Sequence, residues 1–113
     1  MSEAYPANWI RGVLDPCLLA LIGRSGAAYG YDLAAQLEHH GLGRIRGGSL
    51  YPALLRLEDR GLLASEWQAG EGGPGRKCYE LTATGRTELA AYGDQWAQFT
   101  ASVAGLLAAE AHR

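Results

Sequence analysis

A short stretch of the sequence, Gly48–Gly61, combines side chains that are suited to holding nucleic acid. Ser49 and Tyr51 carry hydroxyl groups, and Arg56 carries a guanidinium that forms paired hydrogen bonds with a phosphate or with a guanine edge. With Pro52, they lie on or beside the outward face that this stretch has if it is helical. Such a helix can bury one face and offer the other to a DNA groove, although these residues alone favour a different interpretation. The favoured interpretation of the stretch by itself is an amphipathic helix with an ordinary mixed surface.

The ends of this helix carry residues that are typical of helix ends. Ser49 suits the N-cap, because its hydroxyl accepts from backbone N–H groups that have no partner in the first turn. Pro52 then falls within that turn, where a missing N–H costs nothing, and Gly61 ends the helix. The residues at helical spacing that are expected to be buried are Leu50, Ala53, Leu54 and Leu57.

The composition is that of one small globular domain. Of the 113 residues, 48% are hydrophobic and 19% charged, and no run approaches the ~20 apolar residues of a membrane helix. The N-terminus lacks a secretory layout, and Cys17 and Cys78 have no metal-like spacing, which predicts a cytoplasmic protein with free thiols. The net charge is −2, but residues 41–86 carry +2. A slightly basic middle between acidic ends fits a DNA-binding unit joined to an acidic assembly element.

Two helices are expected upstream and a hairpin downstream. Asp15-Pro16 looks like the N-cap and first position of a helix that reaches Gly23, with a slightly earlier start as the alternative. A second helix is expected over about Gly30–His40. Leu62–Gln68 and Arg76–Thr82 alternate in polarity, and the glycine-rich residues 70–75 between them are expected to lack regular structure. This order is that of a winged helix-turn-helix, a mostly α fold with a small β-hairpin (α+β), in which the loop is the wing.

The last part of the chain, from Thr84 to about Ala109, has the pattern of one long helix. Its apolar residues, spaced alternately three and four apart as in helices that wrap around a partner, are Leu89, Tyr92, Trp96, Phe99, Val103 and Leu106. Trp9 and Ile10 form a second apolar segment without an evident partner. Because the core of the first 82 residues looks complete, a homodimer interface is favoured over packing on the chain's own core. We therefore expect a DNA-binding domain with an N-terminal arm over residues 1–82 and a dimerisation helix over residues 83–113.

Three groups of motifs occur in the order and spacing of a known family. They are Tyr29-Gly30-Tyr31-Asp32-Leu33; Gly48-Ser49-Leu50-Tyr51-Pro52-Ala53-Leu54 with Arg56-Leu57-Glu58 and Gly61-Leu62-Leu63; and Gly75-Arg76-Lys77 with Tyr79-Glu80-Leu81-Thr82 and Gly85-Arg86. Over about Val13–Leu89 the chain resembles the PadR family of bacterial transcriptional regulators. Because it ends soon after the winged domain, it is similar to the family's small subfamily.

The resemblance implies a homodimeric repressor whose third helix enters the major groove of a pseudo-palindromic operator in double-stranded DNA. The DNA-contacting positions that it implies are Tyr31 on the second helix, Ser49, Tyr51, Pro52 and Arg56 on the third, and Arg76 and Lys77 in the wing. The chain departs from the commonest pattern, because its third helix is poor in lysine and its wing tip carries Glu71. Close contact between the wing tip and a minor groove is therefore not expected.

Several of these residues have two possible roles. Arg56 pairs with a guanine or holds a phosphate, and a phosphate is favoured because positioning contacts are commoner. Ser49 and Tyr51 are expected to donate to phosphates, with packing against the second helix as the alternative for Tyr51. Arg44 and Arg46 touch the DNA backbone or are merely solvated.

Trp96, with Tyr92 and Phe99, would lie near the dimer axis if the seam is the interface. Flat aromatic walls there can sandwich a planar ligand, as the resemblance implies for some members of the small subfamily. Plain interface core is the favoured role of Trp96, and ligand stacking is the alternative.

Other classes of function find little support. The sequence has no nucleophile motif, paired carboxylates or phosphate-cradling loop before a helix, so an enzyme is not expected. His39 and His40 point in different directions on a helix, so a metal site is not expected. No cofactor is expected either. A winged helix that binds only protein is the remaining alternative, and the arginine on the outward face speaks against it.

Overall fold

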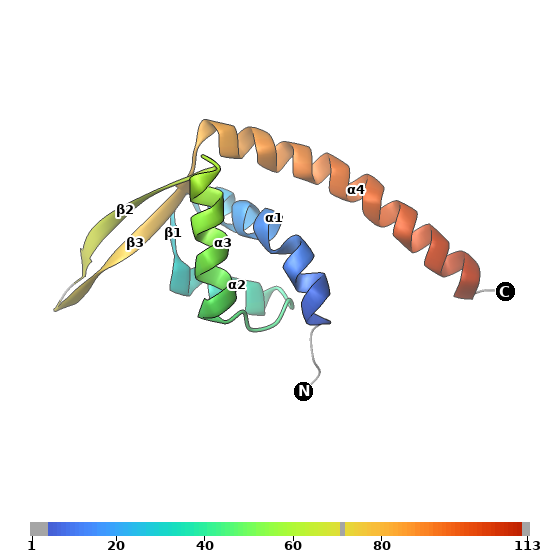
Figure 1. Ribbon diagram of the computed structural model, residues 1–113, viewed down its shortest axis with the longest axis horizontal. Helices are drawn as coiled ribbons and strands as arrows, with labels where there is room; N and C mark the ends of the chain where they lie inside the picture. The colour runs from blue at the N-terminus through green and yellow to red at the C-terminus, as the bar shows by residue number, and fades with distance from the viewer. Residues whose placement is uncertain (1–4, 71, 112–113) are drawn as a thin grey trace.

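The computed structural model describes residues 5–70 and 72–111 and arranges them as four helices and one three-stranded antiparallel sheet, which confirms the α+β winged-helix fold (Figure 1). Glu71, expected at the wing tip, lies outside the described residues. In chain order the elements are α1 (Ala7–Ser25), β1 (Ala28–Tyr29), α2 (Gly30–His39), α3 (Gly47–Asp59), β2 (Leu63–Gly70), β3 (Gly73–Leu81) and α4 (Ala83–Ala111).

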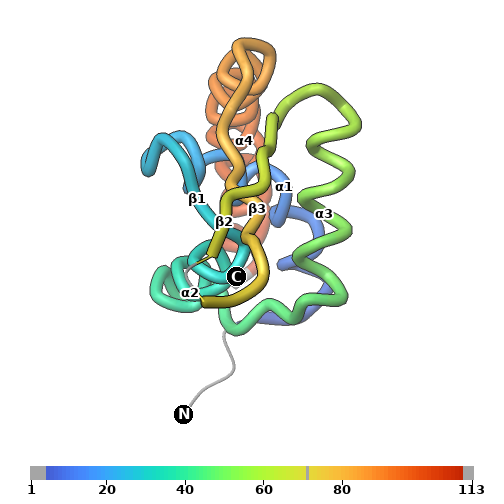
Figure 2. Tube along the Cα trace, turned by 90° about the vertical axis from the view of Figure 1, so that its left-hand side faces the viewer, coloured from blue at the N-terminus to red at the C-terminus, as the bar shows by residue number. Residues whose placement is uncertain are grey.

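The molecule is elongated, because two elements project from a central group of helices. Helices α1, α2 and α3 form the centre, the β2–β3 hairpin extends from one side, and α4 extends from the other (Figure 1). Figure 2 looks at the molecule from the hairpin side and shows α3 and α2 flanking the sheet. The principal extents are 61 × 36 × 20 Å.

The core confirms the predicted inner face of α3. Leu50, Ala53, Leu54 and Leu57 are all buried there. They pack in one cluster with residues of the other elements, among them Leu18, Leu19 and Ile22 of α1, Leu33 and Leu37 of α2, and Leu63, Tyr79 and Leu81 of the sheet. Burial of this apolar face holds α3 with its remaining side directed to solvent.

Helix α1 begins much earlier than expected. The prediction that Asp15 caps a helix starting at Pro16 is wrong, since α1 starts at Ala7 and contains the proline. Pro16 costs one backbone hydrogen bond within the helix, but the buried leucines on both sides of it, such as Leu14 and Leu18, hold the two halves as one element. Trp9 therefore belongs to the first turn of α1 and not to a separate arm.

Helix α3 also begins earlier than predicted. Its N-cap is Arg46, so Ser49 is the third helical residue and does not cap the helix. Pro52 is the sixth, beyond the turn where a missing N–H costs nothing, so its lack of an N–H removes one backbone hydrogen bond from the helix. The predicted end is confirmed: Gly61 has φ +77° and donates its N–H to the Glu58 carbonyl, a glycine-terminated helix end.

The sheet is larger than the predicted hairpin. Strand β1 was missed, because two residues are too short to show an alternating pattern; it pairs Ala28 with Tyr79. The expectation that residues 70–75 lack regular structure is wrong as well, because Gly70 pairs with Gly73 and only two residues separate the strands. Ladder hydrogen bonds come from the backbone, so glycines can extend a hairpin.

Helix α4 takes part in the core, contrary to the expectation that the core is complete without it. Leu89 and Tyr92 are half-buried and pack against the buried cluster. Thr82 fixes the start of the helix: its hydroxyl accepts from the Gly85 N–H at 2.9 Å and donates to the Gly61 carbonyl at 2.6 Å. The end of α3 and the start of α4 are thereby joined.

Candidate nucleic-acid interface

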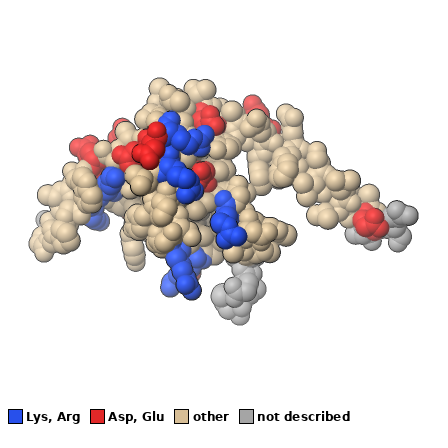
Figure 3. Space-filling model, in the orientation of Figure 1, with Lys and Arg blue, Asp and Glu red and all other residues tan. Residues whose placement is uncertain are grey.

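The outward side of α3 belongs to a face on which basic side chains gather. Figure 3 shows them over α3, at the loop before it and on the hairpin, with acidic side chains concentrated near the end of α3. Ser49 and Pro52, predicted to face DNA, are exposed on this helix. The electrostatics of the face therefore depend on which of its cations are already paired within the protein.

Tyr51 packs against the start of α2, which is the alternative considered for it, and also keeps part of its side chain exposed. A Cβ added to Gly30 at the start of α2 would lie 2.6 Å from Tyr51 Cε1, so the ring packs where only glycine leaves room. The side chain is nevertheless half-exposed and retains a hydroxyl for a ligand. Nearby, Tyr31 in the first turn of α2 is exposed, so its side chain is accessible for the predicted contact with the DNA backbone.

Arg56 has a partner that the sequence did not suggest. Its Nη2 lies 3.2 Å from Asp15 Oδ1, so the guanidinium joins α3 to α1, although 58% of the side chain is still exposed. Sequence reasoning had used Asp15 as a helix cap, which hid its role as a partner. Any DNA contact by Arg56 therefore competes with Asp15.

Lys77 is less available than predicted. It is half-buried, and its Nζ lies 3.3 Å from Glu58 Oε1. Ser65 donates its hydroxyl to the other oxygen of Glu58, and that hydrogen bond, followed by the lysine, lowers the pKa of the Glu58 carboxyl. These contacts tie the hairpin to α3 and set the angle between them.

Arg76 remains exposed and lies over the ring of Tyr29, 4.1 Å from the ring centroid to Cζ. Tyr29 in turn donates its hydroxyl to Gln68 of β2. An arginine held over an aromatic ring keeps its N–H groups for an anion.

The basic residues before α3 border a recess of about 270 Å³. Arg44, Arg46 and Ser49 line it together with Arg11 of α1, a residue that sequence reasoning missed because α1 was expected to begin after it. Arg44 Nε lies 3.7 Å from Glu38 Oε1, but the Arg44 side chain is highly exposed. Three arginines at the mouth of one recess can hold a phosphate.

A second and larger recess lies between α1 and α4. This groove of about 690 Å³ is lined by Trp9 and Ile10 on one side and by Trp96, Phe99 and Val103 on the other. The two apolar segments that lacked partners in the sequence thus face one groove. Leu106, further along α4, is also exposed.

Two other kinds of site are not found in the part of the chain that the structure describes. No group of three or more His, Cys, Asp or Glu side chains could hold a metal ion there. None of the described helices is long and apolar enough to cross a membrane.

Burial raises the pKa of the Cys17 thiol, which keeps it protonated.

Comparisons with known proteins agree on one family. The family model described as "Transcriptional regulator PadR-like family" matches residues 18–91. A PadR family transcriptional regulator from Eggerthella lenta is 39% identical with a TM-score of 0.79, over 88% of this chain and 86% of that one. A PadR-like regulator from Bacillus cereus is 34% identical with a TM-score of 0.77, over 89% and 97%. The transcriptional regulator Rv3488 of Mycobacterium tuberculosis is 43% identical over 61 residues, so the chain spans about half (55%) of that relative.

Proposed function

Because the chain belongs to the PadR-like family of transcriptional regulators, we propose that it is a homodimeric repressor that binds a pseudo-palindromic operator in double-stranded DNA and responds to a planar aromatic effector. It acts in the cytoplasm. DNA binding is implied by the family, and the dimer, the repression and the effector are our additions. Each is supported by a separate part of the structure.

The observation that carries DNA binding is an exposed face of α3 with cations at the start of the helix and on the neighbouring hairpin. Ser49 and Pro52 lie on that face, Arg46 and Arg11 lie at the start of α3, and Arg76 lies on the hairpin. The N-terminus of a helix also favours phosphate, since its dipole is positive there. With α3 in a major groove, these cations are placed for the phosphates on either side.

The dimer is supported by the apolar groove and by the length of α4. The helix has 29 residues, or roughly 43 Å at 1.5 Å per residue. Beyond Tyr92 its apolar side chains are exposed, and helices in proteins derive most of their stability from a packed face. A second copy of the chain, laid against α4 and the first turns of α1, would cover Trp9, Phe99 and Leu106.

The effector is supported by aromatic rings in the same groove. The ring centroids of Trp96 and Phe99 are 5.6 Å apart, and both rings line the groove. In a symmetric dimer the two copies of Trp96 could enclose a flat ligand between them. Tyr92, expected to take part, packs on the core, so its contribution is smaller.

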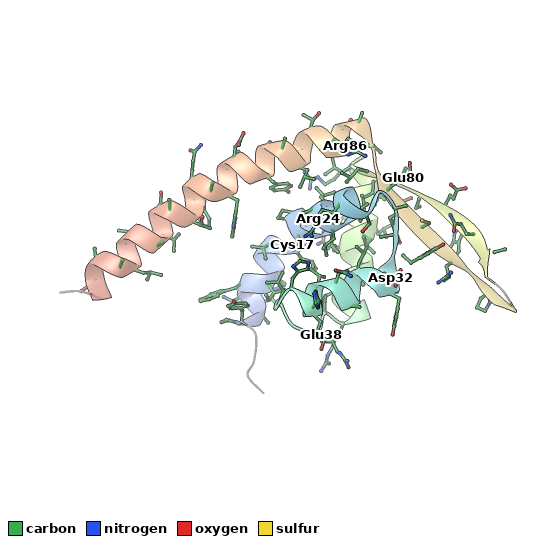
Figure 4. The ribbon with its side chains drawn as sticks, turned by 180° about the vertical axis from the view of Figure 1, so that it is seen from behind. Cys17, Arg24, Asp32, Glu38, Glu80 and Arg86 are labelled. Carbon is green, nitrogen blue, oxygen red and sulfur yellow. The ribbon has the colours of Figure 1, made fainter. Side chains whose placement is uncertain are left out.

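The direct test is binding to genomic DNA fragments, beginning with the fragment upstream of the protein's own gene, in the presence of competitor DNA. Arg56→Ala and Tyr51→Ala should abolish the shift while the dimer persists in light scattering. Tyr51→Phe keeps the ring that packs on Gly30, and loss of its hydroxyl should weaken binding about tenfold, as for one hydrogen bond to a charged group. Arg24→Ala is the matched control, because that exposed arginine lies on the side turned away from α3 (Figure 4).

If the wild-type protein has no sequence preference over competitor at moderate salt, the repressor proposal fails. The alternative, a winged helix that binds only protein, would then account for the fold.

The effector is tested by titrating tryptophan fluorescence with planar dyes. Trp9 and Trp67 also emit, so the comparison with Trp96→Ala is required. We expect Trp96→Ala to weaken dye binding. An unchanged affinity for the dye would refute the effector proposal. For the dimer, Leu106→Asp should yield a monomer in light scattering.

A further inference from the structure

Leu55 on α3 is an exposed apolar side chain that the proposed DNA contacts do not use. It is 54% exposed, whereas the other leucines of this helix are buried. A single exposed leucine is common on protein surfaces, so the inference depends on where this one lies. It follows Gly48 by seven residues and Pro52 by three, and all three are exposed. At helical spacing they share one side of α3, opposite its buried face, and this side is called the outer stripe.

Polar side chains lie on both sides of the outer stripe. Tyr51 lies toward α2 and the hairpin. Arg56 lies toward α1, where its Nη2 is 3.2 Å from Asp15 Oδ1. When a helix enters a major groove, its two flanks are turned to the two phosphate backbones and the side chains between them to the base edges. Leu55 and Pro52 are therefore placed to meet base edges and not phosphates.

The outer stripe matches one chemical group on those edges. Glycine, proline and leucine have no side-chain donor or acceptor, so the stripe cannot form the paired hydrogen bonds that recognise guanine or adenine. The 5-methyl group of thymine is the apolar group that base pairs present in the major groove. Against a G·C pair, the same leucine would separate polar base atoms from water without replacing their hydrogen bonds, which costs free energy.

The charge beyond Leu55 limits how far α3 can enter the groove. Asp59 continues the stripe one turn later and is exposed, and acidic side chains gather near this end of the helix (Figure 3). Phosphates repel carboxylates, so the part of α3 that fits the groove is the part before Asp59. Recognition helices of this kind also contact bases with their N-terminal residues. Leu55 is then the last apolar side chain of the outer stripe within the groove.

We infer that Leu55, with Pro52 beside it, packs on the 5-methyl group of a thymine in each operator half-site and so selects an A·T pair at that position. The inference rests on the proposed DNA binding and adds to it a base preference and the residue that sets it. Phosphate contacts from the two flanks position the helix but carry no sequence information. The preference therefore comes from the outer stripe.

The test replaces thymine by uracil, one position at a time, in a duplex that carries the footprinted site. Uracil lacks the 5-methyl group and keeps every hydrogen-bonding group of thymine. For the wild type we expect a position in each half-site at which uracil weakens binding about fourfold, as for the loss of one buried methyl group. The same change in both half-sites should weaken binding about fifteenfold, because separated positions contribute additively to the free energy. Uracil outside the protected site is the control.

Variants of α3 assign the effect to one side chain. Leu55→Ala should weaken binding to the thymine duplex and make thymine and uracil equivalent at the sensitive position. The salt dependence should stay the same, because no phosphate contact is lost. Leu55→Met keeps an apolar side chain and should keep most of the preference. Arg56→Gln is the matched control on the adjacent residue: it should weaken binding to both duplexes and leave the difference between them intact.

The other outcomes overturn the inference. If uracil leaves the wild-type affinity unchanged at every position of a site that the protein does prefer, the outer stripe reads no thymine, although the repressor proposal stands. If Leu55→Ala retains the preference for thymine, another side chain reads the methyl group. If the wild type prefers no duplex over competitor, both proposals fail. Leu55→Gln replaces Leu55→Ala should the latter lower the urea unfolding midpoint.

Discussion

The ion pair between Asp15 and Arg56 allows two roles of the arginine to be separated. Arg56 lies on the proposed DNA-reading helix, yet in the free protein its guanidinium is held by a carboxylate of α1 at 3.2 Å. Asp15→Asn keeps the shape of the side chain and removes its charge. If Arg56 binds DNA, the substitution removes the carboxylate that competes for its guanidinium, and the affinity for DNA rises. If Arg56 only holds α1 to α3, affinity stays the same.

The size of the effect follows from distance and exposure. Two unit charges at 3.2 Å attract by roughly 1 kcal/mol in water and roughly 5 kcal/mol at the dielectric of a protein surface. The arginine is 58% and the aspartate 24% exposed, so solvent screens the pair and a value near 1 kcal/mol is appropriate. That energy corresponds to about a fivefold change in affinity.

The assay is fluorescence anisotropy on a labelled operator at fixed salt, with urea unfolding in parallel. We expect Asp15→Asn to bind about fivefold more tightly and to lose about 1 kcal/mol of stability. Arg56→Gln should bind at least tenfold more weakly, and Asp15→Asn should have no effect in that background. Asp94→Asn, an exposed carboxylate on α4, measures the general effect of removing one negative charge. Unchanged affinity in both single variants would refute a DNA contact by Arg56.

Three further predictions concern the packing behind the site. Gly30→Ala should cost about 1–2 kcal/mol in urea unfolding, because the new methyl group meets Tyr51 at 2.6 Å, and Tyr51→Ala should remove that cost. Glu58 has a lowered pKa, so its stabilisation is complete above the unfolded value of about 4.3 and is lost as the pH falls through the folded value. The stability difference between wild type and Glu58→Gln should thus shrink below about pH 4, and a constant difference would contradict this. Gly61→Ala should cost about 1 kcal/mol, because its φ is +77°.

The features that were predicted correctly have short-range causes. The inner face of α3 follows from helical spacing, and the residues buried there are Leu50, Ala53, Leu54 and Leu57. Gly61 was recognised as a helix end because glycine adopts positive φ most readily. The long helix α4 likewise follows from a repeated apolar pattern.

The features that were missed depend on residues far apart in the chain. Strand β1 exists because Ala28 meets Tyr79, and no local pattern reports such a pairing. Pro16 and Ser49 were interpreted as helix starts, but α1 starts at Ala7 and α3 at Gly47, so neither residue marks the first turn of its helix. The partner of Arg56 is likewise visible only once α1 and α3 are placed side by side.

The central claim, that α3 reads an operator as half of a pair, is tested most directly by footprinting the purified wild-type protein on genomic fragments at moderate salt with competitor DNA. The account predicts a protected site made of two inverted half-sites, separated by about 10 base pairs or a multiple of this, as a two-fold dimer requires. Protection of a single unpaired half-site, or no protection beyond that of random DNA, would contradict it.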